Sequence, residues 1–387
     1  MSGFWGYRRA DGGAGVRNYL AVIPTVGCVN EVARKVASEI PGARALLHHQ
    51  GCGQLPPDLD QVRRVLAGLG TNANVGAALV VGLGCEGVPA EGVADAIASS
   101  GRAVAVVSLQ EVGGYSRAVA AGVETGQRLF AGIAAQERVR CGADELTIGI
   151  KCGSSDTTQG IAANPAVGAA GDKLIAMGGS SIFCETTEVM GAEHVLAARA
   201  ATPAVAEAIV RRVCDLEREL DRFGVDMRGG QPTAGNIAGG ITSIEEKSLG
   251  AICKAGTAPV QAVLSYGQRP DGRGLFFMDS PGREMEVLTG LVAAGAQVLV
   301  FSTGRGAPQG FPIAPVVKVS GNARTVAWLG EHIDVDVSGI VSGDLALPAA
   351  GELILSRVLA AASGALTKAE IIGYTETMDI YVPGPPI

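Results

Sequence analysis

The sequence has few aromatic residues, few charged residues and no long apolar run. Phe, Trp and Tyr make up 4% of its 387 residues and charged residues 18%, against 47% hydrophobic residues. A core would therefore be built mainly from Val, Ile, Ala and Leu. The longest apolar runs, such as 77–83, reach about a third of a membrane span, and the N-terminus lacks the apolar segment of a secretory signal. We expect no membrane partner.

Basic runs and nucleotide-binding loops are also missing. The net charge is −7, with no basic stripe interleaved with aromatics, which argues against a nucleic-acid partner. Neither a dinucleotide GxGxxG after the first predicted strand nor a GxxxxGK[ST] loop occurs. The eight cysteines show no CxxC spacing. They are typical of reduced thiols in the cytoplasm rather than of a disulfide framework.

What the sequence does contain is an alternation of apolar runs with helical patterns. This order favours an α/β fold in which mostly parallel sheets are flanked by helices. The pattern restarts near Cys141, so we predict a first module over 1–140 and a second, Rossmann-like module over 141–387. The tail 374–387 is rich in proline and is expected to lie over the surface or a partner. The predicted strands are 18–26, 43–49, 77–83, 102–109, 145–152, 180–185, 259–266, 273–279, 296–303 and 314–320.

Chemically active residues gather where these predicted strands end. In open parallel sheets, ligands bind beyond the carboxyl ends of the strands. Six strand ends carry glycine together with cysteine, an acid, threonine or arginine, which indicates a ligand site at this edge. The residues concerned are Cys28, Cys52, Cys85, Glu86, Cys152, Ser155, Asp156, Cys184, Glu185, Glu188 and 302–306. The loop 302–310 (STGRGAPQG) resembles an anion cradle, in which Arg305 and backbone N–H groups would face a carboxylate or phosphate.

The histidines at 48 and 49 raise the question of a metal. Successive side chains of a strand point to opposite faces, so at most one of His48 and His49 binds a given ion. Imidazole, carboxylate and thiolate ligands together suit iron or zinc. An iron–sulfur cluster held by three of the strand-end cysteines (Cys28, Cys52, Cys85, Cys152 and Cys184) is the alternative.

Several longer motifs resemble one family, that of the altronate and galactarate dehydratases, which also includes the large subunit of sulfolactate sulfo-lyase. They follow the family's order and cover most of residues 6 to 370. The motifs are GYRRADGGAGVRNYL, HHQGCG, VVGLGCE, KCGSSDTTQGIAANPAVGAA, ETTEVMGAEHVLAARA, GNIAGGITSIEEKSLGA and TGLVAAGAQVLVFSTGRG.

The resemblance implies a lyase that acts on a 2-hydroxy acid. The expected reaction removes the proton α to the carboxylate and water from the β carbon; the alternative removes sulfite from sulfolactate. A divalent metal would stabilise the enediolate. The resemblance suggests Fe²⁺, with Mn²⁺ or another divalent ion as a substitute. From the residues at the strand ends we expect His48 and Glu86 to hold it, with Cys52 as the candidate third ligand.

The side-chain chemistry of the residues in and near these motifs gives candidates for substrate binding and proton transfer. Candidates for the proton-transfer groups are Lys247, Glu188 and His194, although Lys247 also suits a solvated helix face and His194 a helix-packing role. Arg17 suits a carboxylate as well as a structural ion pair. The residues expected to bind substrate are Arg17, Asn18, Ser155, Asp156, Asn164, Thr303, Gly304 and Arg305.

The chain departs from the family pattern in three respects. It begins at the first family motif, so we expect a separate small SAF-like subunit. As a separate expectation, the chain forms a homo-oligomer. The family's lysine after GN is Ile237 here, and its CGGSD is CGSSD, which weakens the case for a sugar-acid substrate. A non-catalytic scaffold subunit remains the alternative to an enzyme.

Overall fold

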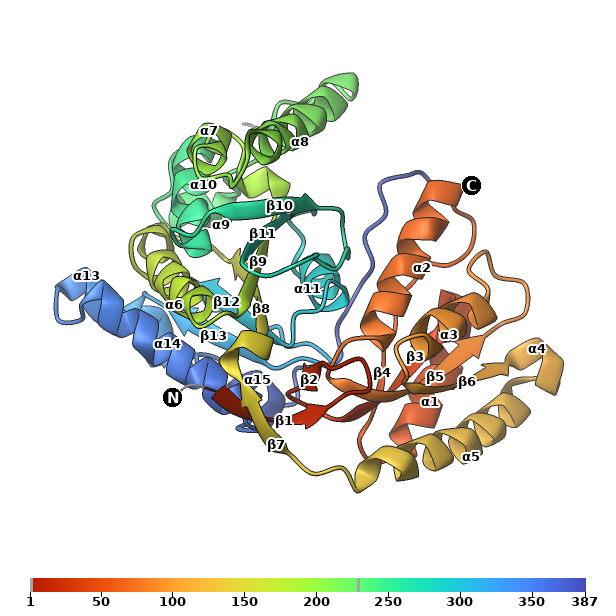
Figure 1. Ribbon diagram of the computed structural model, residues 1–387. Helices are drawn as coiled ribbons and strands as arrows, with labels where there is room; N and C mark the ends of the chain where they lie inside the picture. The colour runs from red at the N-terminus through yellow and green to blue at the C-terminus, as the bar shows by residue number, and fades with distance from the viewer. Residues whose placement is uncertain (1–2, 228–229) are drawn as a thin grey trace.

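Two parallel β-sheets flanked by helices dominate the computed structural model, which describes residues 3–227 and 230–387 (Figure 1). The α/β prediction is confirmed. The first sheet has the order β4-β3-β5-β6. Its strands are β3 (Tyr19–Pro24), β4 (Ala43–Ala45), β5 (Val75–Gly82) and β6 (Ala103–Ser108), and its helices are α1 (Asn30–Ser38), α2 (Pro56–Gly70), α3 (Ala90–Ala98), α4 (Leu109–Val112) and α5 (Tyr115–Ala134).

Both faces of the first sheet are covered, which is why its strands read as continuous apolar runs. Alternate residues of β3 enter different cores. Leu20 and Val22 pack with α1 and α5, whereas Ala21 and Ile23 pack with α2 and α3.

The second sheet has seven parallel strands in the order β10-β11-β9-β8-β12-β13-β14. The chain runs from β8 to β9 on one side and later returns to place β12 on the other side of β8. This reversal is a topological switch point, where α/β sheets bind ligands. The strands are β8 (Thr147–Gly153), β9 (Ser180–Cys184), β10 (Val260–Leu264), β11 (Leu275–Met278), β12 (Val298–Thr303), β13 (Val316–Ser320) and β14 (Val335–Asp336).

Helices α6 and α14 cover one face of this sheet and α11 the other. The helices of this module are α6 (Asn164–Ala176), α7 (Glu193–Ala197), α8 (Pro203–Arg222), α9 (Ala234–Ala238), α10 (Ile244–Ile252), α11 (Glu284–Ala293), α12 (Ala323–Trp328), α13 (Gly339–Ser342), α14 (Leu347–Ala362) and α15 (Lys368–Ile371). Shorter turns are η1 (Gly27–Val29), η2 (Ala143–Glu145), the π-helical η3 (Gln159–Ala163), η4 (Thr186–Glu188) and η6 (Cys253–Ala255).

A small antiparallel sheet, which the sequence did not predict, joins the two modules. Its order is β2-β1-β7, with β1 (Gly3–Arg8), β2 (Ala14–Gly15) and β7 (Val139–Gly142). The N-terminal strand β1 pairs with β7, and Phe4 is buried in the core of the second module. These strands are short and rich in glycine, so they lack the apolar runs on which the strand predictions relied.

The C-terminal tail returns to the first module and runs beside α2 (Figure 1). Met378 and Ile380 are buried in a core shared by α2 and α11. The backbone N–H of Ile387 donates to the carbonyl of Gly53 at 2.9 Å. The division at 140/141 stays a prediction, since β1 and the tail cross it in space. Among the described residues, no helix is both long and apolar enough to cross a membrane.

Candidate functional site

A cavity of about 300 Å³ opens at the carboxyl end of β8, beside the switch point. Four residues predicted from the sequence line it together with Cys152: they are Ser155, Asp156, Asn164 and Lys247. Two larger hollows, of about 460 and 630 Å³, lie beside α8 and among α6, α7, α10 and the start of α14, and neither is lined by Cys152, Ser155 or Asp156. The smaller cavity is therefore the one that combines strand-end polar groups with the position where α/β sheets bind ligands.

The turn after β8 is built around Asp156. Ser154 takes a left-handed conformation with φ 49°, which turns the chain sharply at the strand end. Asp156 Oδ1 then accepts the backbone N–H of Gln159 at 2.9 Å and the hydroxyl of Thr158 at 2.7 Å, so it caps the helix that leads into α6. Its Oδ2 accepts from Asn322 Nδ2 at 2.7 Å, which ties this turn to the end of β13.

The loop after β12 closes against the same turn. A Cβ at position 304 would lie 2.3 Å from the Asp156 carboxyl group, so Gly304 is required for this approach. Thr303 Oγ1 accepts the backbone N–H groups of Gly306 and Ala307, both at 3.0 Å. Arg305 Nη1 donates to the carbonyl of Gly235 at 2.7 Å. Arg305 is exposed, which makes it the outward-facing cation of this loop.

Asn164 braces the cavity from the helix side. Its Nδ2 donates to the carbonyl of Gly250 in α10 at 2.8 Å, and its Oδ1 accepts the hydroxyl of Ser302 at the end of β12. The side chain therefore connects three elements that surround the cavity.

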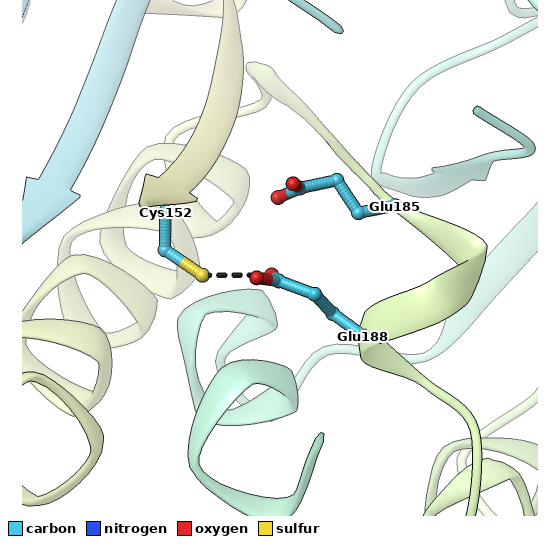
Figure 2. A group of neighbouring side chains, drawn as sticks. All are labelled: Cys152, Glu185 and Glu188. Atoms are coloured by element: carbon cyan, nitrogen blue, oxygen red, sulfur yellow. Dashed lines mark hydrogen bonds between the residues drawn. The ribbon is translucent and has the colours of Figure 1, made fainter. Parts of the chain in front are cut away.

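Behind the cavity lies a fully buried cluster of charged groups. Cys152 comes from β8, and Glu185 and Glu188 from the end of β9 and η4; Figure 2 shows these three side chains pointing toward one another. The Lys254 ammonium donates to Glu188 Oε2 at 2.6 Å, Cys152 Sγ at 3.0 Å and Glu185 Oε2 at 3.1 Å. Lys151 Nζ donates to Glu185 Oε1 at 2.5 Å. Two carboxylates thus face two ammonium groups, and the four charges balance.

Burial and the neighbouring charges set the protonation of this cluster. Burial and the nearby Glu188 raise the pKa of Glu185 to about 7. Although burial opposes it, the pKa of Glu188 falls well below its usual range because Lys254, Lys247 and Lys151 surround it. Burial and Glu188 raise the pKa of Cys152 to about 12, so the thiol stays protonated and donates to Glu188 Oε2 at 2.9 Å.

Lys247 connects the buried cluster to the cavity. It lies in α10, whose start is capped by the hydroxyl of Ser243. Its Nζ is 3.7 Å from Glu188 Oε1 and 2.7 Å from Gln231 Oε1, and its side chain is only 12% exposed. Lys247 therefore faces the cavity wall and Glu188 rather than forming part of a solvated helix face.

The cluster also offers a compact set of metal ligands. The Cys152 sulfur and one carboxylate oxygen each from Glu185 and Glu188 lie within 4.8 Å of one another, which is compatible with a divalent metal. In the structure the Lys254 ammonium bonds to all three, and the Cys152 thiol would have to lose its proton to become a ligand. A metal ion would therefore require Lys254 to move away.

The metal ligands predicted at the first sheet are not grouped in this way within the described part of the chain. His48 is buried; its Nε2 bonds to the carbonyl of Pro24 at 2.8 Å and its Nδ1 accepts the N–H of Gln50 at 3.1 Å. Glu86 accepts the hydroxyl of Thr25 at 2.8 Å and backbone N–H groups of its own loop. Cys52 is exposed. Ligation through His48 would replace one of its two backbone bonds.

The stability of the protein should depend on His48 as the pH falls. Burial lowers the pKa of His48 from 6.5 to about 4. Between these two pH values the imidazole is protonated in the unfolded chain and neutral in the folded chain. This contribution, at most about 3 kcal/mol, is complete above the unfolded pKa and is lost as the pH falls toward 4. Denaturant unfolding at about pH 7 and about pH 4.5 should show a weaker pH dependence for His48→Gln than for the wild type. The exposed neighbour supplies the control: His49→Gln should keep the wild-type dependence, and identical profiles for both variants would contradict the assignment.

Arg17 and Asn18 lie at the opposite end of the first sheet, before β3. Arg17 forms a bidentate pair with Glu370, with both distances 2.9 Å, and donates to three backbone carbonyls. Asn18 bonds to Arg9 and to the carbonyl of Ile133. The structure does not bring either residue to the cavity, and it places His194 on the exposed surface of α7.

Sequence reasoning did not assign roles to Lys151 and Lys254. Lys151 could have been recognised, because it lies inside an otherwise apolar strand. A buried lysine needs a partner of opposite charge, so its position predicts a buried ion pair. Nothing in the local sequence around Lys254 distinguishes it from a surface lysine. Its partners come from β8 and β9, about 70 to 100 residues away along the chain.

The fold and the cavity define an α/β protein with polar groups and a charged cluster at the switch point of its larger sheet. Residues 143–382 match the family described as D-galactarate/altronate dehydratase, C-terminal, and residues 6–134 match D-galactarate dehydratase/altronate hydrolase, second domain. The chain belongs to this dehydratase family, as its motifs indicated.

Curated relatives support the same class. The chain is 40% identical to a protein of Chromohalobacter salexigens named (2R)-sulfolactate sulfo-lyase subunit beta, over 96% of each chain. It is 36% identical to an altronate dehydratase of Bacillus subtilis, over 88% of this chain and 70% of that protein, and 34% identical to one of Escherichia coli, over 93% and 74%. All three names describe lyases, so the chain is an enzyme of the lyase class.

Proposed function

We propose that the chain removes water from a 2-hydroxy acid by β-elimination in the cavity at the end of β8. The observation that carries the proposal is the placement of Lys247, which lines the cavity while its ammonium approaches Glu188 in the buried cluster. In this reaction the proton on C2 goes to a base, the C3 hydroxyl leaves as water, and the resulting enol becomes a 2-keto acid.

Lys247 is the proposed proton-transfer group. The reaction needs a base within hydrogen-bond reach of C2–H and positive charge near the carboxylate, which gains electron density as the proton leaves. Lys254 and Lys151 already balance the two buried carboxylates, so Lys247 is an additional cation at the cavity wall. As a neutral amine it can take the C2 proton, and as an ammonium it can hold the resulting enediolate.

Glu188 is proposed to position Lys247. Its carboxylate stays ionised because three lysines surround it, and the Cys152 thiol and Lys254 fix its orientation. The hydroxyl of Ser155, which lines the cavity, is proposed to receive the substrate carboxylate. Arg305 is a second proposed anion partner, from the loop after β12.

A divalent metal such as Fe²⁺ would supply Lewis acidity toward the carboxylate and 2-hydroxyl of the substrate. In the described residues, both candidate ligand sets are engaged with other partners: Lys254 bonds the buried triad, and backbone groups bond His48 and Glu86. The proposed proton transfer therefore relies on the side chains of the cavity itself.

Sulfite is the second candidate leaving group. The sulfo-lyase relative matches along 96% of its length, and Ile237 replaces the family's lysine in this chain. The similarity to the altronate dehydratases favours water as the leaving group. Because the sulfo-lyase relative is named as a subunit, we also propose that a separately encoded small subunit binds this chain.

The test is a substrate screen of anaerobically prepared, iron-supplemented protein, with and without a candidate small subunit. Sugar acids and sulfolactate are offered, and 2-keto acid and sulfite are measured. We expect 2-keto acid without sulfite from a sugar acid. Release of sulfite together with pyruvate from sulfolactate would contradict the dehydratase proposal and support the sulfo-lyase reaction. The absence of both products in every combination would contradict a lyase activity of this cavity.

A further inference from the structure

Three exposed cysteines lie at the carboxyl edge of the first sheet, on the other module from the cavity. Cys28 follows β3, Cys52 follows β4 and Cys85 follows β5, and these three strands are neighbours in the sheet. By contrast, Cys152 and Cys184 are buried in the second sheet. The structure thus divides the strand-end cysteines into an exposed set of three and a buried pair.

The three loops that carry these cysteines are hydrogen-bonded to one another. The N–H of Gly27 donates to the carbonyl of Gln50 at 3.1 Å, and the N–H of Gly87 donates to the carbonyl of Gly51 at 2.9 Å. Each exposed cysteine is one or two residues from such a bond, and each step along the chain covers about 3.8 Å. The three thiols therefore emerge from one continuous patch of backbone.

Glycines make this close approach possible. Gly51 has φ 109°, and a Cβ there would lie 2.1 Å from the carbonyl oxygen of Thr25. Gly84 has φ 114°, and a Cβ there would lie 2.7 Å from Gln110 Oε1. A side chain at position 51 would force the loops after β3 and β4 apart, whereas one at position 84 would meet the side chain of Gln110 in α4.

His48 holds two of these three loops together. Its two ring nitrogens connect the end of β3, at Pro24, to the loop after β4, at Gln50. Glu86 in turn accepts the hydroxyl of Thr25, which joins the loops after β3 and β5. The side chains around the cysteines thus hold the loops together and leave the thiols exposed.

We propose that Cys28, Cys52 and Cys85 together bind a [4Fe–4S] cluster. Three irons each take one of these thiolates, and the fourth iron has no cysteine from these loops. The binding step is ligation: each thiol releases its proton to solvent as its sulfur bonds to iron, and neither the protein nor the cluster is oxidised. The inference goes beyond the proposed function, because it concerns the other sheet and a different cofactor.

A single metal ion fits these thiols less well. Thiolates around one zinc ion, at about 2.3 Å from it, would lie about 3.8 Å from one another. Within the described residues, the group of three ligands that lies inside 4.8 Å is the buried triad and not these cysteines. A cluster presents a separate iron to each thiolate, so it suits sulfurs that are spaced more widely.

The test uses the full chain, purified without oxygen and reconstituted with iron and sulfide. We expect about 4 iron and about 4 sulfide per chain, visible charge-transfer absorbance, and a paramagnetic signal after reduction. Cys28→Ser, Cys52→Ser and Cys85→Ser should each lose most of the sulfide and the absorbance. Cys214→Ser, in α8, is the matched control and should keep both.

Alkylation of the thiols gives a second readout that does not depend on variants. In the reconstituted protein the three cysteines should be protected from a thiol reagent, and an iron chelator should restore their labelling. Iron or zinc bound at about one per chain without sulfide, a disulfide among the three cysteines in anaerobic protein, or a triple serine variant that retains iron and sulfide would each overturn the proposal. Circular dichroism would identify a variant that lost the cluster only because it failed to fold.

Discussion

Lys254→Met should lower the free energy of unfolding by about 3–5 kcal/mol. The ammonium of Lys254 is fully buried and bonds to Glu185, Glu188 and Cys152. Met preserves much of the side-chain volume but leaves two buried carboxylates with one buried ammonium. Removing one partner of a buried ion pair costs more than the pair itself contributes, because an uncompensated charge remains in a low dielectric.

The control for this variant is Lys173→Met. Lys173 pairs with Glu352 on the surface, where the two side chains are 32% and 62% exposed. Such a pair contributes about 0–1 kcal/mol, so the control should unfold at nearly the wild-type denaturant concentration. Equal destabilisation by the two substitutions, measured by urea unfolding at neutral pH, would show that the buried cluster is not the charge-balanced unit that its distances indicate.

Lys247→Ala should reduce kcat by about 10²–10⁴-fold on whichever 2-hydroxy acid the enzyme converts. The amine of Lys247 is the proposed proton-transfer group, and among the residues that the structure describes it is the one cationic side chain lining the cavity. Lys247→Arg should not restore turnover, because a guanidinium keeps its proton at any working pH. Steady-state kinetics on the substrate found in the screen give the measurement.

Two comparisons separate catalysis from folding for this residue. Lys247→Ala should unfold within about 1 kcal/mol of the wild type, because Lys247 is bonded to Gln231 and lies 3.7 Å from Glu188 rather than in a short buried pair. Lys173→Ala, on α6, should keep full activity. A Lys247→Ala enzyme with nearly wild-type kcat would remove Lys247 from the mechanism.

Much of the fold could be predicted from the sequence because the buried strands are continuous apolar runs. Each predicted strand overlaps a strand of one of the two parallel sheets. Parallel strands have their carboxyl ends along one edge of a sheet, and this rule placed Ser155 and Asp156 at the cavity. Asn164, at the start of α6, was predicted from the family motifs instead. The local sequence pattern was sufficient to predict the strands and the residues at their carboxyl ends.

The remaining features depend on contacts between distant parts of the chain. The pairing of β1 with β7 joins residues more than 130 positions apart, and neither strand has an apolar run. The sequence left Arg17 as a candidate for binding a substrate carboxylate. Its actual partner, Glu370, is 353 positions away along the chain, so local pattern could not reveal the pair. Lys254 looks like a surface lysine in the sequence, and only the packing of η6 against β8 and β9 buries it.

The central claim is that this chain's own cavity removes the proton on C2 of a 2-hydroxy acid. The most direct measurement follows a substrate deuterated at C2 through a single turnover, with wild-type and Lys247→Ala enzyme, by NMR of the 2-keto acid. We predict that the wild type loses the C2 deuterium to solvent and that the variant forms product at a small fraction of the wild-type rate. Deuterium retained in the product, or equal rates for the two enzymes, would contradict the account.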